Sequence, residues 1–472
     1  MTKLTAGEIE SGTSGILSTG SRDAVFSGVS IDSRTVGSGE IFFAIRGPNQ
    51  DGHNFVATAF SQGAAGVVVE KNYTGEIPEG RVMIRVENTH EALKSLARAV
   101  RLAWRGTLAA ITGSMGKTTS REFAYHLIKN RFHVCQTPGN YNNLFGLPLA
   151  LLGLSPEYEV GLFEMGMSAA GEIAEMCGIA LPTIGILTNV APVHLEFFAS
   201  IEEIAEAKGE LVSGLPIDGT LIYNADDPLI VRLARSFGGG KISFGKSEGA
   251  DIRADNIEIS DLQTTRFRLS YDGQSRSVSL PFPGAHYVWN VLPGIALSRH
   301  LGITIDEIPE ALGKLRPAAM RGGILRFQEG FTVIDDSYNA NPNALRNMIE
   351  TLTAVPGFSR RVLVAGEMLE LGKDAPEMHF ECGEFAVKHG VDVIIGIRGN
   401  AEEIVRAATH AGIPGERARF FENAEEAAEF TAAAARSGDL ILVKGSRGVH
   451  TEKVVKKLTE GFTVIKDTDG EN

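Results

Sequence analysis

Short apolar runs alternate with longer amphipathic segments through the middle of the chain. From about residue 105 the apolar runs read TLAAITG, EVGLFEMG, PTIGILTNV and GTLIYNADDP. The segments between them repeat their apolar positions at helical spacing, and they predict helices at 117–131, 168–178 and 201–213. This alternation of strands and helices predicts a parallel sheet that is covered by helices on both faces.

The pattern of apolar and polar residues is different before this central region, after it, and in one segment within it. Up to about residue 104, short strands and Gly-rich turns precede the helix-like THEALKSLARAVRLAW. Residues 251–280 alternate with period two and predict an antiparallel patch, and a second α/β rhythm begins near residue 317. We predict an α/β protein with a small N-terminal α/β domain (1–104), a central parallel-sheet domain containing the antiparallel patch (105–316) and a Rossmann-like C-terminal domain (317–472).

Composition and charge narrow the class of protein. The chain has 472 residues, of which 43% are hydrophobic, and its formal net charge of −13 argues against a surface for nucleic acid or anionic lipid. No apolar run approaches the roughly 18 residues of a membrane-spanning helix, and MTKLTAGEIESG lacks the apolar core of a secretory signal. We expect a cytoplasmic protein without a disulfide or zinc site, whose Cys135, Cys177 and Cys382 are reduced.

The stretch ITGSMGKTT, residues 111–119, follows an apolar run and precedes a predicted helix. A strand, a Gly-rich turn, Lys and Thr in this order are typical of a phosphate loop, where backbone N–H groups and the helix dipole bind phosphate. We expect Lys117 to reach the β- and γ-phosphate oxygens and Thr118 to bind Mg²⁺. Ile111 replaces the first Gly of the standard loop, which disfavours a Ras-like switch or a motor and favours another user of ATP. A plain turn is the alternative, but it would not need Lys-Thr-Thr after it.

Three further polar residues stand near the ends of predicted strands or on the helix that follows. Glu164 lies in EVGLFEMG, His194 follows PTIGILTNV, and Lys208 lies on the apolar face of the predicted helix 201–213. Each has a simpler explanation: a carboxylate at the edge of the core, a structural His, and a Lys that extends to solvent. Together they predict a Mg²⁺ site, because a buried amine at Lys208 with a lowered pKa would react with CO₂ to give a carbamate oxygen ligand.

An ordered set of motifs resembles a known enzyme family. The motifs are ITGSMGKTT, FEMGMSAAGEIAEM, TNVAPVHLEFFASIEEIAEAKGEL, YNADDP, PGAHYVWN, MRGG and DDSYNANP. They resemble the Mur ligase superfamily, the ATP-dependent amide-forming enzymes of peptidoglycan precursor synthesis. TPGNYNNLFGLP, DDSYNANP and AGEMLELG narrow the resemblance to the branch that adds D-alanyl-D-alanine, and SRTVGSGEIFFAIRGPNQDGHNF resembles a uridine-nucleotide-binding segment. The resemblance runs from about residue 30 to about residue 455.

The resemblance implies a reaction and its participants. The enzyme would join D-Ala-D-Ala to UDP-MurNAc-tripeptide through an acyl phosphate, giving the pentapeptide used in peptidoglycan and cell wall biogenesis and hence in cell shape and division. It would use ATP, two Mg²⁺ ions and a carbamylated Lys208, with no nucleic acid partner and no membrane insertion, and we expect a monomer. The alternatives are the sister ligase that adds the third residue of the stem peptide, a folylpolyglutamate-synthase-like ligase, and a regulatory ATP-binding protein derived from a ligase.

The resemblance also implies a role for individual positions. The catalytic positions would be Lys117, Glu164, His194, Lys208, Arg321 and Asp336. The nucleotide positions would be Thr112, Gly113, Ser114, Met115, Gly116, Lys117, Thr118, Thr119, Asn290, Arg321 and Asp336, and the metal positions Thr118, Glu164, His194 and Lys208. The substrate positions would be Ser33, Arg34, Asp51, Gly52, His53, Thr137, Asn140, Asn142 and Asn143.

Two residues depart from the family pattern. Met115 stands in the phosphate loop where the family usually has Asn, which a loop built of backbone amides tolerates. Tyr287 stands in HYVWN, residues 286–290, where the family has a second Asn. The Tyr removes an amide donor on the nucleotide side of the site.

Overall fold

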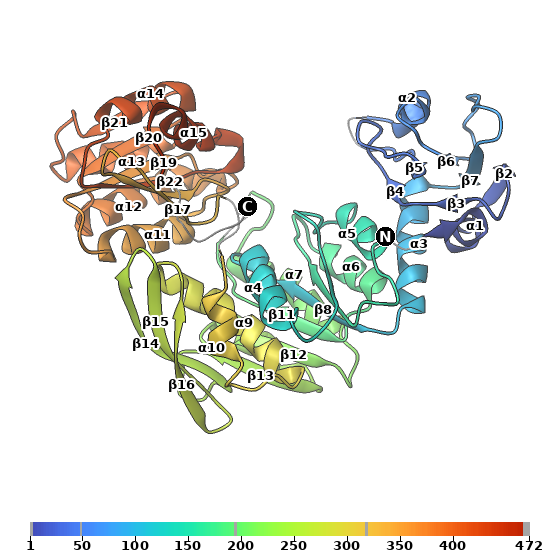
Figure 1. The fold of residues 1–472 in the computed structure, drawn as a ribbon, viewed down its shortest axis with the longest axis horizontal. Helices are drawn as coiled ribbons and strands as arrows, with labels where there is room; N and C mark the ends of the chain where they lie inside the picture. Colours follow the sequence, from blue (N-terminus) through green and yellow to red (C-terminus); the bar gives the residue numbers. More distant parts are fainter. Residues whose placement is uncertain (1–2, 48–49, 193–195, 317–319, 466–472) are drawn as a thin grey trace.

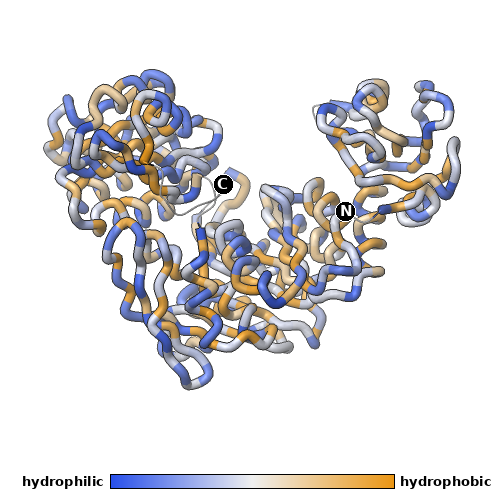
Figure 2. The backbone as a smooth tube through the Cα atoms, in the orientation of Figure 1, coloured by the Kyte–Doolittle hydropathy of each residue, from blue (hydrophilic) through white to orange (hydrophobic). Residues whose placement is uncertain are grey.

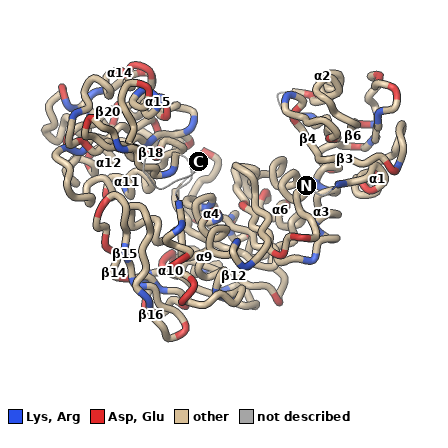
Figure 3. The backbone as a smooth tube through the Cα atoms, in the orientation of Figure 1, with Lys and Arg blue, Asp and Glu red and all other residues tan. Residues whose placement is uncertain are grey.

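The structure is a computed structural model that describes residues 3–47, 50–192, 196–316 and 320–465. Figure 1 shows the described residues as three lobes, with the N-terminal lobe and the C-terminal lobe on opposite sides of a central one. The hydrophobic residues concentrate in the sheets and in the helix faces that cover them (Figure 2). Acidic and basic residues are interspersed over all three lobes (Figure 3).

The N-terminal lobe is built on a mixed sheet with the strand order β2-β7-β6-β5-β4. Its strands β4 to β7 are parallel, and β2 is antiparallel to β7. The elements are β1 (Leu4–Thr5), α1 (Ala6–Thr13), β2 (Ile16–Thr19), β3 (Val25–Phe26), β4 (Val29–Ser30), β5 (Ile41–Phe43), η1 (Gly52–Phe55), α2 (Val56–Ser61), β6 (Gly66–Glu70), β7 (Val82–Val86) and α3 (Thr89–Ala103).

The helix α3 joins this lobe to the central one. Asn88 caps its N-terminus, and its apolar face packs on the N-terminal lobe and on helices α5 (Gly146–Leu151) and α6 (Glu172–Ala180) of the central lobe. Arg101 donates to the carbonyl oxygen of Ala180 at 2.7 Å. One continuous apolar cluster therefore runs from Leu4 through α3 to the face of the central sheet that carries Leu108.

The central sheet has the strand order β16-β15-β14-β13-β12-β11-β8-β10-β9. Strands β8 to β14 run parallel, and β14, β15 and β16 pair antiparallel, so the predicted patch at 251–280 is confirmed. The strands are β8 (Thr107–Thr112), β9 (Val134–Gln136), β10 (Val160–Glu164), β11 (Ile184–Leu187), β12 (Thr220–Asn224), β13 (Gly240–Gly245), β14 (Ile252–Asp261), β15 (Thr264–Tyr271) and β16 (Gln274–Leu280). The remaining helices are α4 (Lys117–Ile128), α7 (Ile201–Ser213), α8 (Pro228–Arg235), α9 (Ala285–His300) and α10 (Ile308–Gly313).

Apolar clusters cover both faces of this sheet, as the continuous hydrophobic runs predict. Leu108 and Ala110 of β8 belong to one cluster, and Ala109 and Ile111 belong to the other. Because successive side chains of a strand point to opposite faces, β8 is buried on both sides. Ile111 is a core residue, which accounts for the missing first Gly of the loop.

The C-terminal lobe carries a second mostly parallel sheet with the order β17-β18-β22-β19-β20-β21, in which β17 is antiparallel. Its strands are β17 (Gly323–Arg326), β18 (Thr332–Asp336), β19 (Arg360–Gly366), β20 (Val393–Ile397), β21 (Ala418–Phe421) and β22 (Asp439–Lys444). Its helices are α11 (Pro342–Ala354), η2 (Gly372–Asp374), α12 (Ala375–Lys388), α13 (Ala401–His410), α14 (Ala424–Ala434), η3 (Arg447–Val449) and α15 (Glu452–Gly461).

The predicted α/β fold class is confirmed, and the helix boundaries differ in detail. The helix α7 has the predicted bounds, because Ser200 caps it at one end. The helix α6 begins at Glu172 and not at 168, since the N–H groups of Ser168 and Ala169 donate to the Glu172 carboxylate and Gly171 has a φ of 91°. No helix in the described ranges has the length and apolar character needed to cross a bilayer.

Candidate functional site

The carboxyl ends of β8, β10 and β11 meet at one edge of the central sheet. β8 lies between β10 and β11, with Glu164 of β10 paired to Ile111 and Leu187 of β11 paired to Thr112. Such an edge is where open parallel sheets bind ligands. The predicted phosphate loop follows β8 at this edge and leads into α4.

Asn189, which follows β11, holds the outer part of the loop. Its backbone oxygen accepts from the N–H of Ser114 at 2.9 Å, and its side chain accepts from Met115 N–H at 2.8 Å and donates to Met115 O at 2.9 Å. The N–H groups of Ser114 and Met115 are thus engaged inside the protein rather than free for a ligand. These contacts use only the backbone of residue 115, so Met fits there as well as Asn would.

After the inner part of the loop, the first turn of α4 has backbone N–H groups that can donate to a ligand. Gly116 begins the helix with a φ of 74° and no side-chain cap, so the first-turn N–H groups of Lys117, Thr118 and Thr119 lack helical partners. A Cβ at residue 116 would lie 2.3 Å from Asn290 Oδ1, so Asn290 of α9 lies directly against the loop. This end of α4 has the free donors and the dipole direction that an anionic ligand requires.

Lys117 turns back over the loop. Its Nζ donates to the carbonyl oxygen of Gly113 at 2.7 Å, and burial together with the positive charge of Arg321 lowers its pKa, against the opposing effect of Glu164. Thr112 and Gly113 shape the base of the loop, where Thr112 Oγ1 donates to Met165 O at 2.7 Å and a Cβ at Gly113 would lie 1.9 Å from Thr188 Oγ1.

Glu164 is the centre of a hydrogen-bonded cluster beside Lys117. It is 2% exposed and accepts from Thr118 Oγ1 at 2.9 Å and from Asn142 Nδ2 at 2.8 Å. Its backbone N–H donates to Thr137 Oγ1 at 2.9 Å. Arg121 of α4, also 2% exposed, donates to Thr137 O at 2.5 Å and lies 3.9 Å from the Glu164 carboxylate. The carboxylate is therefore held at the phosphate loop by groups from two separate segments, the helix α4 and the loop 137–143.

Lys208 lies on the buried face of α7. It is 2% exposed, and none of the described residues forms a hydrogen bond or ion pair with it. Burial and the nearby charge of Lys117 lower its pKa well below the ordinary value. The Lys does not extend to solvent, so that simpler explanation is wrong.

The donors at Glu164 suit a hard divalent cation. Mg²⁺ binds through one or two carboxylates, water and substrate phosphates, and the Thr118 hydroxyl beside the Glu164 carboxylate provides oxygen donors of that kind next to a phosphate loop. Within the described ranges, no three His, Cys, Asp or Glu side chains come together as a metal site. His194, the third predicted ligand, lies outside the described residues.

Residues of the C-terminal lobe face this edge. Arg321 stacks over the ring of Tyr338 at 4.0 Å, and its charge influences both Lys117 and Asp336. Asp336, at the end of β18, pairs with Lys444 at the end of β22. Burial raises the pKa of Asp336, against the opposing effect of Lys444. Burial and the charge of Lys444 lower the pKa of His286, from α9 of the central lobe, to about 3.

The predicted uridine positions lie in the N-terminal lobe. Ser33 is buried, and the neighbouring Arg34 is 83% exposed in its side chain. Hydrogen bonds from Arg34 lower the pKa of Asp32 to about 2, so that carboxylate stays ionised and orients the guanidinium. Arg34 thus presents a fixed cation at the surface of the lobe.

The segment 51–53 forms a compact turn in the same lobe. Asp51 caps η1 and accepts from His53 Nδ1 at 2.6 Å, while His53 Nε2 accepts from Glu70 N–H at 2.9 Å. These two bonds fix the orientation of the His53 ring. A Cβ at Gly52 would lie 2.6 Å from Ile45 O, so only Gly fits.

The loop 137–143 approaches the phosphate loop from the opposite side. Asn142 and Thr137 hold Glu164, whereas Asn140 O accepts from Asn142 N–H at 2.7 Å and Asn143 caps the turn into α5. The structure therefore brings Thr137 and Asn142 to the predicted metal ligand and gives Asn140 and Asn143 a structural role in the loop.

Three residues of this site were not predicted from the sequence pattern: Arg121, Asn189 and Lys444. Lys444 ends an apolar strand in DLILVKGS, so the strand-end argument applied to Glu164 would have found it. Asn189 lies two residues after the end of β11. Arg121 had no such signal, because it occupies a helix and is buried only through the fold of residues 137–139 over it.

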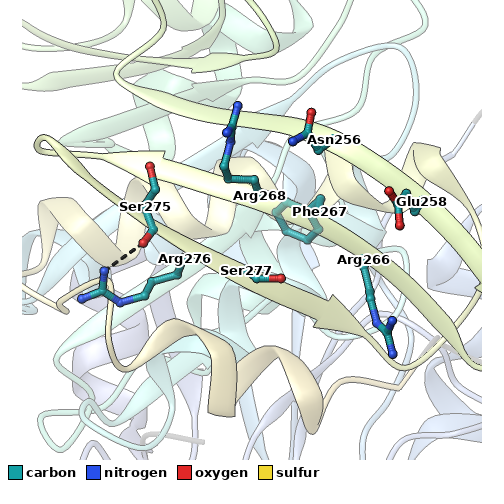
Figure 4. A pocket seen from close by; sticks show the side chains of 8 residues that line it. All are labelled: Asn256, Glu258, Arg266, Phe267, Arg268, Ser275, Arg276 and Ser277. Carbon is teal, nitrogen blue, oxygen red and sulfur yellow. Dashed lines mark hydrogen bonds between the residues drawn. The ribbon is translucent and has the colours of Figure 1, made fainter.

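A separate hollow lies on the antiparallel patch, far along the sheet from β8 (Figure 4). Two of the Arg side chains that line it are engaged locally, since Arg268 pairs with Asp255 and Arg276 pairs with Asp306. None of the predicted site residues lines it.

Comparison with known proteins covers nearly the whole chain. The sequence matches the Mur ligase family catalytic domain over residues 25–101, the Mur ligase middle domain over 111–298 and the Mur ligase glutamate ligase domain over 320–447. It is 33% identical to the UDP-N-acetylmuramoyl-tripeptide–D-alanyl-D-alanine ligase of Escherichia coli (strain K12), over 93% of this chain and 95% of that protein.

Solved structures agree. MurF from Acinetobacter baumannii superposes with a TM-score of 0.86 at 27% identity, over 98% of this chain and 99% of that one. The MurF ligase from Thermotoga maritima in complex with ADP has a TM-score of 0.80 at 30% identity, over 92% and 97% of the two chains. The chain therefore belongs to the Mur ligase family, as an ATP-dependent amide-forming ligase of the MurF type.

Proposed function

We propose that the protein joins D-alanyl-D-alanine to UDP-N-acetylmuramoyl-tripeptide, with ATP as the source of energy. One observation carries the proposal: the Thr118–Glu164 pair and Lys117 stand together on a phosphate loop, in a chain that ligases of this name match almost from end to end. The ADP complex of a similar structure supports ATP as the nucleotide. The names of the relatives favour this reaction over the sister ligase and the folate ligase.

ATP is needed because an amine does not displace oxide from a carboxylate at neutral pH. The tripeptide carboxylate attacks the γ-phosphorus of ATP, and ADP leaves. The amine of D-Ala-D-Ala then attacks the acyl carbon, loses a proton, and releases inorganic phosphate. Water competes with the amine for the acyl phosphate, so the site must exclude it.

The residues of the central lobe would bind the triphosphate. Lys117 would exchange its bond to Gly113 O for phosphate oxygens, and the first-turn N–H groups of α4 would donate to the same group. Thr118 and Glu164 would hold one Mg²⁺ ion, and Glu164, His194 and a carbamylated Lys208 a second. Mg²⁺ would neutralise the charge that accumulates between the phosphate and the carboxylate.

The outer lobes would supply the other substrate contacts. Ser33, Arg34 and residues 51–53 would hold the uridine diphosphate arm, which suits the exposed cation at Arg34. Arg321 and Asp336 would complete the nucleotide site from the C-terminal lobe, since the charge of Arg321 already influences Lys117. A single chain carries all these groups, which supports a monomer, and the need for ATP supports a cytoplasmic location.

The test measures phosphate release from ATP and Mg²⁺ with UDP-MurNAc-tripeptide, with and without D-Ala-D-Ala, and the mass of the product. We expect release that depends on the dipeptide and a product heavier by one D-Ala-D-Ala less water. Turnover with a single amino acid on UDP-MurNAc-dipeptide instead would establish the sister ligase. No turnover with any of these substrates would favour the regulatory ATP-binding protein.

A further inference from the structure

Tyr287, which departs from the family pattern, connects the central lobe to the start of the C-terminal lobe. It lies in the first turn of α9, and its Oη donates to the carbonyl oxygen of Arg321 at 2.7 Å. Arg321 precedes β17, the first strand of the C-terminal lobe. The hydroxyl thus fixes the backbone of a residue that sequence analysis places in the active site.

On the C-terminal side of this hydrogen bond, the residue next to Arg321 leaves room only for the Tyr287 hydroxyl. Gly322 has a φ of 86°, and a Cβ there would lie 1.9 Å from Tyr287 Oη. Tyr287 is 3% exposed, and burial raises its pKa well above the ordinary value, so the phenol keeps its proton at neutral pH. The hydroxyl is therefore a permanent donor to this carbonyl.

The ring of Tyr287 is held from the phosphate-loop side. It packs edge-on against Phe282 with ring centroids 4.7 Å apart, and Phe282 stacks on Phe123 at 5.6 Å. Phe123 belongs to α4, the helix that begins at Lys117. A packed chain of aromatic rings therefore connects the helix of the phosphate loop to the backbone of Arg321.

The side chain of Arg321 depends on where that backbone lies. Its guanidinium stacks 4.0 Å from the centre of the Tyr338 ring and is close enough to influence Lys117. A shift of the Arg321 carbonyl would move the Cα and hence the direction of the guanidinium. A misplaced charge of this kind lowers a reaction rate without unfolding the protein.

We infer that Tyr287 is a positioning residue that holds Arg321 in register with the phosphate loop. This inference rests on the proposed function, in which Arg321 contacts the nucleotide. Tyr287 itself touches neither substrate in this scheme, and it acts through the Arg321 backbone.

The test compares Tyr287→Phe in two backgrounds, the wild-type chain and Arg321→Ala. We expect Tyr287→Phe to lower kcat about fivefold, the factor corresponding to one hydrogen bond, with the KM for ATP changed less than about twofold. In the Arg321→Ala background the same substitution should change kcat by less than about twofold, because the group that it positions is gone.

Matched controls separate this role from a general loss of packing. Tyr271 is a buried Tyr of the same lobe whose Oη has no hydrogen-bond partner among the described residues, so Tyr271→Phe should leave kcat unchanged. Gly322→Ala should lower kcat as Tyr287→Phe does, because the added Cβ displaces the phenol, whereas Gly323→Ala has open space at its Cβ. If Tyr287→Phe does not fold, the comparison of Gly322→Ala with Gly323→Ala tests the positioning role of Tyr287.

Two results would overturn the inference. One is an unchanged kcat in Tyr287→Phe, and the other is an equal loss with and without Arg321. Both require an active wild-type enzyme, so an inactive wild type would instead count against the proposed function.

Discussion

Replacing Lys208 by Ala and by Met tests whether its buried amine serves the reaction. The side chain is 2% exposed, and Lys208→Ala would leave a cavity that costs about 2–5 kcal/mol of stability, as in Met→Ala changes. The same change removes a desolvated amine that has no ion-pair partner among the described residues, and this removal offsets part of the cost. Because the two effects oppose each other, the Ala variant should fold. Lys208→Met keeps the volume and removes the ammonium, and it should be more stable than the wild type in Mg²⁺-free, CO₂-depleted buffer.

Both variants should lose activity, by about a thousandfold, which corresponds to roughly 4 kcal/mol of lost transition-state stabilisation. The Ala and Met variants should differ in whether an added carboxylate restores activity. Formate or acetate can enter the cavity of the Ala variant and supply the missing carboxylate oxygens, but Met fills that space. Phosphate release measured against carboxylate concentration should therefore recover in part for Lys208→Ala and not for Lys208→Met. Full activity of the Met variant, or equal rescue of both, would refute the argument.

The stability difference between the wild type and Lys208→Met should depend on pH. Burial lowers the pKa of Lys208 in the folded protein, so between that pKa and the ordinary value of 10.5 the unfolded chain binds a proton that the folded chain does not. The destabilisation by Lys208 is complete below the folded pKa and fades as the pH rises towards the ordinary value. Urea unfolding of both proteins at about pH 8 and about pH 10 should show the difference shrinking, because stability rises with pH where the unfolded state binds more protons. A constant difference would mean that the amine is not buried.

Three further substitutions have defined outcomes. Lys117→Ala should abolish ATP turnover with unchanged circular dichroism, whereas Lys129→Ala, at the exposed end of the same helix, should remain active. Arg34→Ala should raise the KM for the uridine substrate about tenfold or more with stability changed by less than about 0.5 kcal/mol, because the side chain is 83% exposed. Gly52→Ala should lower the free energy of unfolding by about 1–3 kcal/mol and weaken uridine-substrate binding, because its Cβ would lie 2.6 Å from a carbonyl oxygen. Gly249→Ala, with open space at its Cβ, is the control in the same unfolding and binding measurements.

Residue patterns predicted the elements that depend on local sequence. The helix α7 follows from its apolar repeat, and the antiparallel patch follows from alternation with period two over 251–280. The strand-end rule also located Glu164, because the carboxyl ends of parallel strands meet wherever the sheet forms. Such features need no knowledge of distant contacts.

Contacts between segments that are far apart in the chain could not be predicted from the sequence. Arg121 is a polar helix residue in the sequence and a buried partner of Thr137 in the fold. The N–H groups of Ser114 and Met115 are predicted phosphate ligands, yet they donate to Asn189, which lies in the segment after β11. In each case the deciding contact joins segments that the sequence alone does not bring together.

The apolar clusters show which lobes are packed together as one body. The apolar cluster of the N-terminal lobe continues through α3 into the central lobe, so the N-terminal lobe and the sheet that carries the phosphate loop belong to one packed body. The C-terminal lobe has its own clusters, and the central lobe contributes to them through Leu262 at the turn after β14. Tyr287 and Leu262 both contact that lobe, and the Tyr287 hydrogen bond ties the backbone of Arg321 to the central lobe that carries the phosphate loop. We therefore expect Arg321 to stay in register with the phosphate loop while the acyl phosphate forms and is shielded from water.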